Sequence, residues 1–435
     1  MHNQAPPPIP RARSRRRIWQ LRTLALGTAL TFSLLLAEGL LQIAPGLLPT
    51  SFRKNYPPNG VEFFDRGVLE RTPLNAVPLP YGVQPYDGPP PHDIGDFGVA
   101  TPANTERDRR EVPRLVLPAD SDGLPNVSRP TNPDLVLVGD SFTVFAAQQE
   151  PSGLQNALET EHGASCLNVG ISGIGPDQEL WLLKNVGLPS KPRAVVWFLF
   201  GGNDFMDAFW LRWSLAAGKQ TYADLYKDQR APRLLLPSLI ANWISPKVQE
   251  SLGTDVSPLA PLTLRDHADS DMWFAPDVLR ILSLPPKLLT EQSTWVGITE
   301  VLQEAHTAVE SAGAKLLIVF VPSKEQVYLP QIHPDAALLH AYTKASTFIA
   351  VPMADDPDQL LADLLANAGT FEAAVRAFCE SSGIQFWSAT PALTKASLTG
   401  KPLYYRTDTH WRAEGQHVIV PGLREQLTQL GITKQ

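Results

Sequence analysis

The sequence predicts an α/β protein in which a doubly wound, mostly parallel sheet of five strands follows a single N-terminal transmembrane helix. Three observations support this fold class: five short apolar runs follow residue 134, helical stretches alternate with them, and a 25-residue apolar segment lies near the N-terminus. Strands that alternate with helices form a parallel sheet with helices on both faces. A hydrophobic content of 43% and a charged content of 19% are ordinary for a globular protein and argue against wholesale disorder.

The N-terminal segment has the pattern of a signal anchor. Residues 24–48 carry one charge, Glu38, and are long enough to span a bilayer. Residues 11–22 before them contain six arginines and no acidic residue. Basic residues remain on the cytoplasmic side, so the rest of the chain is expected in the periplasm or outside the cell. A cleaved signal peptide and a buried soluble helix are the alternatives, and the arginine run fits the second poorly.

The charge of the remaining chain excludes one class of partner. Removing those six arginines from the 37 Lys and Arg residues leaves 31 against 44 Asp and Glu residues. Such an acidic body is a poor binder of nucleic acid, because affinity for nucleic acid comes largely from basic contacts to phosphate. We therefore expect the six arginines to orient the N-terminal helix in the membrane and not to bind a nucleic acid.

The chain divides into four expected parts. Residues 1–23 form a basic cytoplasmic tail, 24–48 the anchor, 49–134 a proline-rich tether and irregular lead-in, and 135–435 the α/β domain. An insertion at 205–290 interrupts the alternation; its many Trp and Tyr residues suit either a small separate core or a lid for a carbohydrate or acyl group. The two cysteines form no disulfide framework; they could pair outside the cytoplasm or remain free in the core.

The elements of the α/β domain follow from local patterns. Continuous apolar runs, typical of strands buried on both faces, predict strands at 135–138, 166–169, 194–200, 315–321 and 384–387. Helix signals predict helices at 176–186, 293–312, 370–382 and 413–430. Ser293 is expected to cap the helix at 293–312. Gly313 and Gly383 are expected to end the helices at 293–312 and 370–382. Pro421 predicts a break or kink in the last helix.

Four polar stretches follow the strands or precede the last helix. GDSF (139–142) follows the first strand, LNVGISGIG (167–175) overlaps and follows the second, GGND (201–204) follows the third, and TDTHW (407–411) precedes the last helix. Ligands of open α/β sheets bind at the carboxyl ends of the strands. Taken alone, GDS could simply cap a helix, since Asp and Ser often do so.

Together these stretches supply the parts of a serine acyl-transfer site. Ser141 is a weak nucleophile and needs a base, for which His410 is the candidate, and Asp408 can fix the tautomer of His410. Glycine amides and the Asn203 side chain can stabilise an oxyanion. His417 is a rival base but has no acid beside it. Asp140 and Asp204 suggest no metal site, because no further ligands cluster with them, and we expect no cofactor.

These motifs resemble the SGNH (GDSL-type) hydrolase superfamily, and the resemblance covers residues 135 to 417. It implies a three-layer flavodoxin-like fold, a Ser141–His410–Asp408 triad, and an oxyanion hole formed by the amides of Ser141 and Gly173 with the side chain of Asn203.

One spacing departs from that superfamily's usual pattern. The acid lies two residues before the histidine instead of three and Trp411 follows it, a D-x-H-W form similar to that of SGNH-like proteins that O-acetylate alginate and other exopolysaccharides. The stretch FVPSKEQVY (320–328) also looks like theirs, which makes Lys324 and Tyr328, with Asp140 and Trp411, candidates for substrate contact. In the alginate proteins, however, D-x-H-W precedes the serine motif.

The resemblance implies a membrane-anchored O-acetyltransferase of a cell-surface or secreted polysaccharide, with a membrane-bound acyl exporter as partner. An SGNH carbohydrate esterase or lipase-like hydrolase is the alternative within the same chemistry. A non-catalytic polysaccharide-binding protein is the alternative outside it, and the complete set of catalytic residue types argues against that reading.

Overall fold

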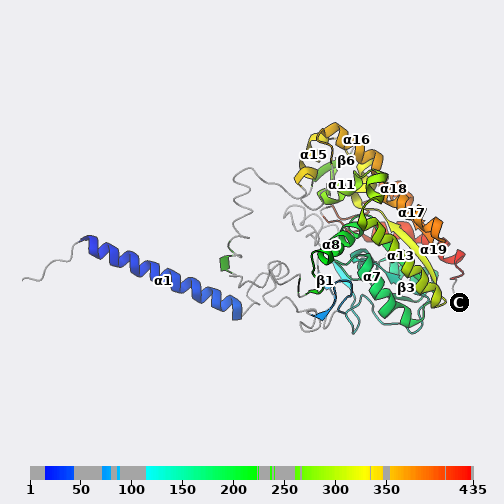
Figure 1. Cartoon of the computed structure of the whole chain (residues 1–435), viewed down its shortest axis with the longest axis horizontal. Coiled ribbons are helices and arrows are strands. Elements are labelled where there is room, and N and C mark those ends of the chain that lie inside the picture. Colours follow the sequence, from blue (N-terminus) through cyan, green and yellow to red (C-terminus); the bar gives the residue numbers. More distant parts are fainter. Residues whose placement is uncertain are drawn as a thin grey trace, which may run out of the picture. The chain divides into compact units, whose positions relative to one another are not determined.

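The computed structural model describes residues 15–43, 71–79, 86–88, 114–222, 224, 236–237, 240, 260–264, 267–333, 335–345, 353–406 and 408–432 (Figure 1). They belong to two compact units, which we describe separately. The first comprises residues 1–61 and 227–255, and the second comprises residues 62–226 and 256–435.

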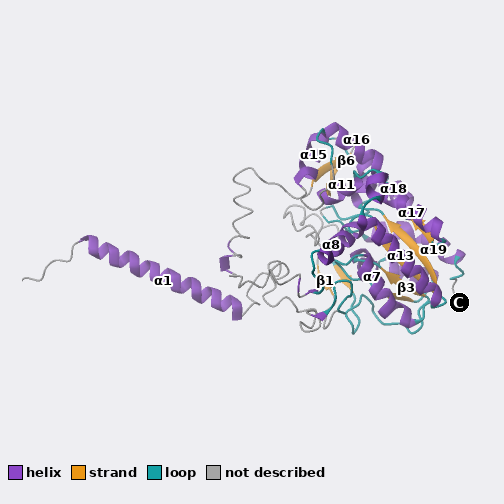
Figure 2. Ribbon diagram, viewed as in Figure 1, coloured by secondary structure: helices purple, strands orange, loops and turns teal. Residues whose placement is uncertain are grey.

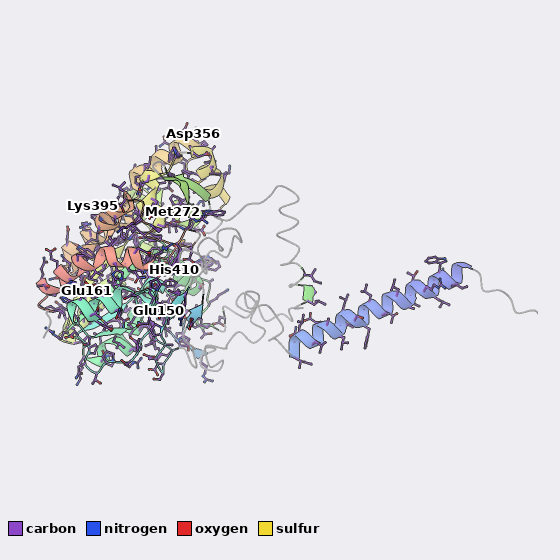
Figure 3. The ribbon with its side chains drawn as sticks, turned by 180° about the vertical axis from the view of Figure 1, so that it is seen from behind. Glu150, Glu161, Met272, Asp356, Lys395 and His410 are labelled. Carbon is purple, nitrogen blue, oxygen red and sulfur yellow. The ribbon has the colours of Figure 1, made fainter. Side chains whose placement is uncertain are left out.

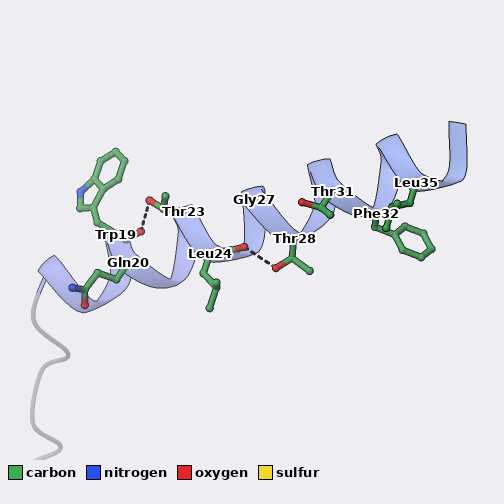
Figure 4. A pocket seen from close by; sticks show the side chains of 9 residues that line it. All are labelled: Trp19, Gln20, Thr23, Leu24, Gly27, Thr28, Thr31, Phe32 and Leu35. Carbon is green, nitrogen blue, oxygen red and sulfur yellow. Dashed lines mark hydrogen bonds between the residues drawn. The ribbon is translucent and has the colours of Figure 1, made fainter. Parts of the chain in front are cut away.

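The first unit contains helix α1 (Arg15–Ile43). Its segment Ile18–Ile43 has a mean hydropathy of 1.8 and is long and apolar enough to cross a membrane, a test that a signal sequence also passes. The hydroxyls of Thr23 and Thr28 donate to backbone carbonyls four residues earlier, at 3.0 and 2.9 Å (Figure 4). These two hydroxyl groups are thereby satisfied within the helix, which suits apolar surroundings.

A shallow pocket is lined by side chains of α1 alone (Figure 4). It is lined by Trp19, Gln20, Thr23, Leu24, Gly27, Thr28, Thr31, Phe32 and Leu35. Because these residues all belong to one helix that buries none of its apolar segment, the pocket is a furrow between side chains and not a substrate cavity.

The second unit is built on a five-stranded parallel sheet, which confirms the predicted fold class. Its strands are β3 (Leu135–Val138), β4 (Cys166–Asn168), β5 (Ala194–Phe200), β8 (Lys315–Val321) and β9 (Gln385–Ser388). Each predicted strand is present, with bounds that differ by no more than one residue at either end.

The order of the strands in the sheet is β4-β3-β5-β8-β9. The chain therefore starts in β3, moves outward to β4, then returns to the other side of β3 and continues in one direction. This is the flavodoxin-like order, and the reversal between β3 and β5 creates the switch point at which such sheets bind ligands. Ser141 follows β3 and Asn203 follows β5, so the topology brings both to this point.

Side chains of the sheet point alternately into two cores. Leu135 and Leu137 belong to one cluster, whereas Val136 and Val138 belong to the other. Burial on both faces explains why the strands read as continuous apolar runs. Helices α5, α6, α14, α18 and α19 contribute to the first core, and α7, α8, α13 and α17 to the second, so the strands lie between helices (Figure 2).

The helices of this unit begin and end as follows: α5 (Ser141–Ala146), α6 (Leu154–Ala157), α7 (Pro176–Leu182), α8 (Asp204–Ala216), α11 (Pro276–Leu282), α12 (Pro286–Thr290), α13 (Ser293–Ser311), α14 (Lys324–Tyr328), α15 (Ala336–Ala345), α16 (Pro357–Asn367), α17 (Thr370–Ser382), α18 (Thr390–Ser397) and α19 (Ala413–Gln429). The four predicted helices correspond to α7, α13, α17 and α19. Helix α7 continues as a π-helical turn over Leu183–Gly187.

Two predicted helix details differ in the structure. Helix α19 continues through Pro421, so the predicted break is wrong, because one missing N–H is outweighed by a buried apolar face of Ile419, Val420, Leu423 and Leu427. A kink at Pro421 stays a prediction. Ser293 is the first residue of α13 and not its cap. The N-cap position is held by Gln292, which has an extended backbone and makes no capping bond with its side chain.

Two short antiparallel pairs complete the described strands. Strands β1 (Tyr86–Gly88) and β2 (Leu115–Leu117) pair within the lead-in, most of which lies outside the described residues. Strands β6 (Ala260–Leu264) and β7 (His267–Phe274) form a hairpin within the predicted insertion. Much of 223–259 also lies outside the described residues, so the lid interpretation stays a prediction.

The two cysteines are free and buried in different cores. Cys166 on β4 belongs to the first cluster and Cys379 on α17 to the second. Because the sheet separates these clusters, the possible Cys166–Cys379 disulfide is ruled out.

Candidate active site

The turn that carries Ser141 requires glycine at its first position. Gly139 has φ +149°, and a Cβ there would lie 2.2 Å from Thr143 Oγ1 and 2.8 Å from the Phe198 carbonyl oxygen. Both the backbone conformation and the space therefore exclude a side chain. The chain can thus leave β3 and enter α5 within two residues, which places Ser141 at the carboxyl edge of the sheet.

Asp140 caps the helix that Ser141 begins. Its Oδ1 accepts the Phe142 N–H at 2.9 Å, and its Oδ2 accepts the Ser141 hydroxyl at 3.4 Å. The capping interpretation of the GDS motif is therefore right for Asp140, while Ser141 is the first helical residue. Since Asp140 is fully buried, the structure gives it a role in shaping the serine turn; substrate contact by Asp140 remains a prediction.

Asp408 and His410, the two polar residues of the D-x-H-W motif, contact each other directly. Asp408 Oδ1 lies 2.6 Å from His410 Nδ1 and also accepts the His410 backbone N–H at 2.7 Å. Because a carboxylate only accepts hydrogen bonds, Nδ1 carries the proton and the lone pair of the neutral ring is on Nε2. A spacing of two residues thus lets one oxygen hold both the ring and the backbone of the histidine.

Three aromatic contacts join this pair to the serine turn. The His410 ring stacks on Phe145 of α5 with centroids 4.4 Å apart and lies 5.2 Å from the Phe142 ring. The Trp411 indole N–H donates to the Phe142 carbonyl at 3.2 Å. Since Phe142 follows Ser141 directly, residues almost 270 positions apart in sequence come together at one turn. Figure 3 shows His410 within this unit, far from Asp356 at the surface.

The loop after β4 lies between the helices that begin near Ser141 and Asn203. A Cβ on Gly170 would lie 2.8 Å from Thr143 Cβ of α5, and one on Gly175 would lie 2.6 Å from Asp207 Cβ of α8. Gly173, between them, has φ +75° and open space around it. Glycine is therefore favoured at 173 for its backbone conformation, and a role of its amide in an oxyanion hole stays a prediction.

Asn203 lies at the start of α8 and is nearly buried. Its side-chain amide donates to Asp207 Oδ2 at 2.8 Å. A primary amide has two N–H groups, so this bond fixes the orientation of the amide and the second N–H can serve an oxyanion.

Two other carboxyl groups of this region are fully buried. Glu179 of α7 accepts the Trp197 indole N–H at 2.6 Å, and Asp204 accepts the Phe200 backbone N–H at 2.6 Å. Burial raises the pKa of both well above the usual range, and their mutual repulsion and that of Asp140 add to it. Burial of both carboxyl groups therefore favours their protonated, neutral forms.

Three candidates for substrate contact lie in the interior. Lys324, Tyr328 and Trp411 are at most 1% exposed. Lys324 binds backbone carbonyls near Asp408, the Tyr328 hydroxyl accepts the Leu403 N–H at 3.2 Å, and Trp411 binds α5 as described. These contacts support the segment that carries the acid and base. A direct contact with substrate by these three residues remains untested.

The rival base lies elsewhere. His417 is exposed on α19, and its Nε2 lies 2.9 Å from the Ser152 carbonyl oxygen. The partner of this ring is a backbone carbonyl, whereas that of His410 is a carboxylate, so the geometry favours His410 as the base. Within the described ranges, no cluster of three or more His, Cys, Asp or Glu residues could hold a metal ion.

Sequence reasoning missed several residues that shape the site. Asn126 exchanges two bonds with the backbone of Asn168, accepting its N–H at 2.8 Å and donating to its carbonyl at 2.9 Å. Asn168 in turn donates to the Thr143 carbonyl at 2.7 Å. These bonds tie the lead-in, β4 and α5 together, and no local pattern around Asn126 signals them. Phe145 could have been found, as one helical turn beyond Ser141.

No protein-family model matches the chain, and no curated protein matches it. The solved structures similar to it include three that each share 12% sequence identity with it. They are an alpha/beta hydrolase from the metagenome of Lake Arreo, Spain (TM-score 0.33; 68% of this chain and 94% of that one), a catalytic mutant of an acetylxylan esterase from Geobacillus stearothermophilus (0.31; 69% and 95%), and a lipase/acylhydrolase from Enterococcus faecalis (0.28; 68% and 95%).

Proposed function

We propose that this chain is a serine acyl-transfer enzyme that acts on esters through an acyl-serine intermediate. The observation that carries the proposal is the 2.6 Å contact between Asp408 Oδ1 and His410 Nδ1, in a segment that packs directly on the Ser141 turn. Serine catalysis needs a nucleophile, a base that can take its proton, and an acid that orients the base. Ser141, His410 and Asp408 fill these roles.

The reaction follows from the roles of these groups. Ser141 Oγ attacks the ester carbonyl carbon while His410 Nε2 takes its proton. The resulting oxyanion is stabilised by the backbone N–H groups of Ser141 and Gly173 and by the Asn203 amide. The tetrahedral intermediate then breaks its bond to the leaving alcohol, which takes the proton from His410. The acyl group remains on Ser141.

A second nucleophile completes the cycle. A hydroxyl group gives its proton to His410 Nε2 and attacks the acyl-serine, releasing Ser141. If this hydroxyl belongs to a sugar, the enzyme is a polysaccharide O-acetyltransferase; if it belongs to water, the enzyme is an esterase. We favour the transferase, on the D-x-H-W motif and the apolar N-terminal helix, with a carbohydrate as acceptor and a membrane-bound acyl exporter as the source of acyl groups.

Location is part of the proposal. We infer that α1 is a retained anchor with the arginine-rich tail in the cytoplasm and the α/β unit in the periplasm or outside the cell. Intact mass measurement of the chain purified from membranes tests retention, and protease accessibility in spheroplasts tests orientation. A mature chain that begins after residue 43 would identify a cleaved signal instead.

The first experiment uses the full chain in detergent with p-nitrophenyl acetate, comparing wild type with Ser141→Ala. We expect release of nitrophenol to fall about 10³-fold or more in the variant, because the covalent route is lost. Equal rates would refute the acyl-serine mechanism. An exposed serine such as Ser381→Ala on α17 serves as the matched control and should leave the rate unchanged.

A second assay separates transferase from esterase. Oligosaccharide acceptors are added at increasing concentration, and acetylated sugar and free acetate are measured by mass spectrometry. A serine-dependent shift from acetate to acetylated sugar supports the transferase. Acetate release that no acceptor diverts supports the hydrolase.

A further inference from the structure

The side chain of Lys324 is buried against the segment that supplies the catalytic acid. Its Nζ lies 2.9 Å from the Asp408 carbonyl oxygen, 3.1 Å from that of Arg406 and 3.3 Å from that of Tyr405. An ammonium group has three N–H donors, so its donors match the three carbonyls. The residue is only 1% exposed.

Burial of an ammonium group is costly unless it is fully bonded. A lysine would not occupy this position merely to fill space, since methionine or leucine would do so without that cost. The three carbonyl dipoles compensate the charge and, in return, are held around a single point. Lys324 therefore constrains the backbone at Tyr405, Arg406 and Asp408.

Several other contacts also hold this turn. Backbone bonds from Tyr405 N–H to the His410 carbonyl (3.0 Å) and from Arg412 N–H to the Leu403 carbonyl (2.8 Å) close its base. The Trp273 N–H donates to the Arg406 carbonyl at 3.0 Å, and the Tyr404 hydroxyl donates to the Pro322 carbonyl at 2.7 Å. The Lys324 ammonium adds a bond to the backbone of Asp408 itself.

The position of Lys324 in the fold links the sheet to the acid. It is the first residue of α14, three residues after the end of β8. Strand β8 pairs with β5 along seven residues, and β5 leads to Asn203. The ammonium group thus fixes the backbone of Asp408 relative to the same sheet that positions Asn203, the proposed oxyanion donor.

We propose that Lys324 is the positioning residue of the acid–base pair: its ammonium group holds the Asp408 backbone so that the carboxylate meets His410 Nδ1. This proposal rests on the function proposed above, in which Asp408 orients His410. It assigns the 320–328 stretch a role in assembling the triad instead of contacting substrate.

The test compares Lys324→Met with Lys315→Met in the full chain. Both substitutions keep an unbranched side chain, shorter by the one atom that carries the charge, and so remove the ammonium. Lys315 Nζ binds one carbonyl, that of Leu430 at 2.8 Å, at the opposite end of β8. We expect Lys324→Met to lower kcat about 100-fold with little change in KM, as a misplacement of about 1 Å does. Lys315→Met should leave both constants near wild type.

A second readout does not depend on turnover. In chain labelled with ¹⁵N-histidine, the short Nδ1–H bond of His410 gives a strongly downfield proton signal, assigned by its loss in His410→Gln. We expect this signal to be lost or shifted upfield in Lys324→Met and retained in Lys315→Met. If Ser141→Ala proved as active as wild type, the proposed function would fail, while this signal would still decide the role of Lys324.

Folding is monitored by circular dichroism for every variant. Lys324→Gln retains two N–H donors without the charge, and it should recover part of both the signal and kcat. A folded Lys324→Met with wild-type kcat and an unchanged His410 signal would overturn the proposal. So would the unfolding of both Lys324 variants, since the lysine would then serve the whole fold and not the acid.

Discussion

At the scale of single residues, the two-residue spacing between acid and base has a clear physical result. Asp408 Oδ1 accepts both the backbone and the ring N–H of His410, so one oxygen sets the position and the tautomer of the base. The pair is nearly free of solvent, with Asp408 fully buried. In a low-dielectric setting such a charge-assisted bond is stronger and more directional than in water.

Asp408→Asn should lower kcat about 10⁴-fold, because the amide can donate to Nδ1 and favour the wrong tautomer. Steady-state hydrolysis of p-nitrophenyl acetate measures the effect. Asp356→Asn is the control: this exposed aspartate accepts the Gln359 N–H at the start of α16 and has no contact with the site. A rate in Asp408→Asn within tenfold of wild type would contradict the assignment.

Gly173 can be tested against a glycine with the same backbone. Gly173 and Gly313 both have φ +75° and open space where a Cβ would lie. Alanine at either site should cost about 1–2 kcal/mol of stability, from left-handed strain alone. Only Gly173→Ala should also lower kcat, because its amide serves the oxyanion. Chemical denaturation and kinetics measure the two effects; equal kcat values would remove Gly173 from the oxyanion hole.

At the scale of elements, α7 packs a carboxyl group against β5 in the second core. Glu179 bonds to the Trp197 indole, and burial raises its pKa well above the usual value. The folded state therefore binds a proton that the unfolded chain releases near pH 4.3. Its contribution to stability is fully present below that pH and declines as pH rises towards the folded-state pKa.

Glu179→Gln should accordingly flatten the pH dependence of stability. Glutamine can still accept the indole N–H but needs no proton, so we expect a gain in melting temperature that grows from pH 5 to pH 8. Thermal melts across this range measure it. Glu304→Gln on α13, an exposed residue bonded to Lys184 at 2.6 Å, should show no such growth. A constant difference between Glu179→Gln and wild type at all pH values would contradict the raised pKa.

At the scale of the whole molecule, the sheet divides the described α/β unit into two cores. Cys166 is buried in one core and Cys379 in the other. Burial raises the pKa of Cys379 to about 12 and that of Cys166 well above its usual value. Reactivity follows the thiolate and its exposure. Native chain should therefore show no thiol reactive with Ellman's reagent within minutes, and chain in 8 M urea should show two without added reductant.

The same two-core arrangement explains why the strands were predictable. A strand buried on both faces must be apolar at every position, and this rule located β3, β4, β5, β8 and β9 to within a residue. Helix ends followed from glycine, as at Gly383, which adopts φ +71° after α17. The predicted break at Pro421 is absent because tertiary packing of α19 overrides the loss of one hydrogen bond.

The site was predictable only in part. Ser141, Asn203 and His410 could be named because each follows a strand or precedes a helix in a recognisable motif. Two of their supports could not: Asn126 and Glu179 act through contacts with residues distant in sequence. Lys324 was noticed, but its role depends on three carbonyls more than 80 positions away, which no local pattern reveals.

The sequence by itself determined the strands, the helices between them, the apolar N-terminal segment and the residue types of the proposed chemistry. These are local properties, since burial, backbone conformation and side-chain chemistry leave marks within a few residues. Tertiary structure alone decided the strand order, the switch point between β3 and β5, the separation of Cys166 from Cys379 and the burial of Lys324. Those features depend on which distant segments pack together, because the free energy of packing comes from contacts between residues that are far apart in the sequence.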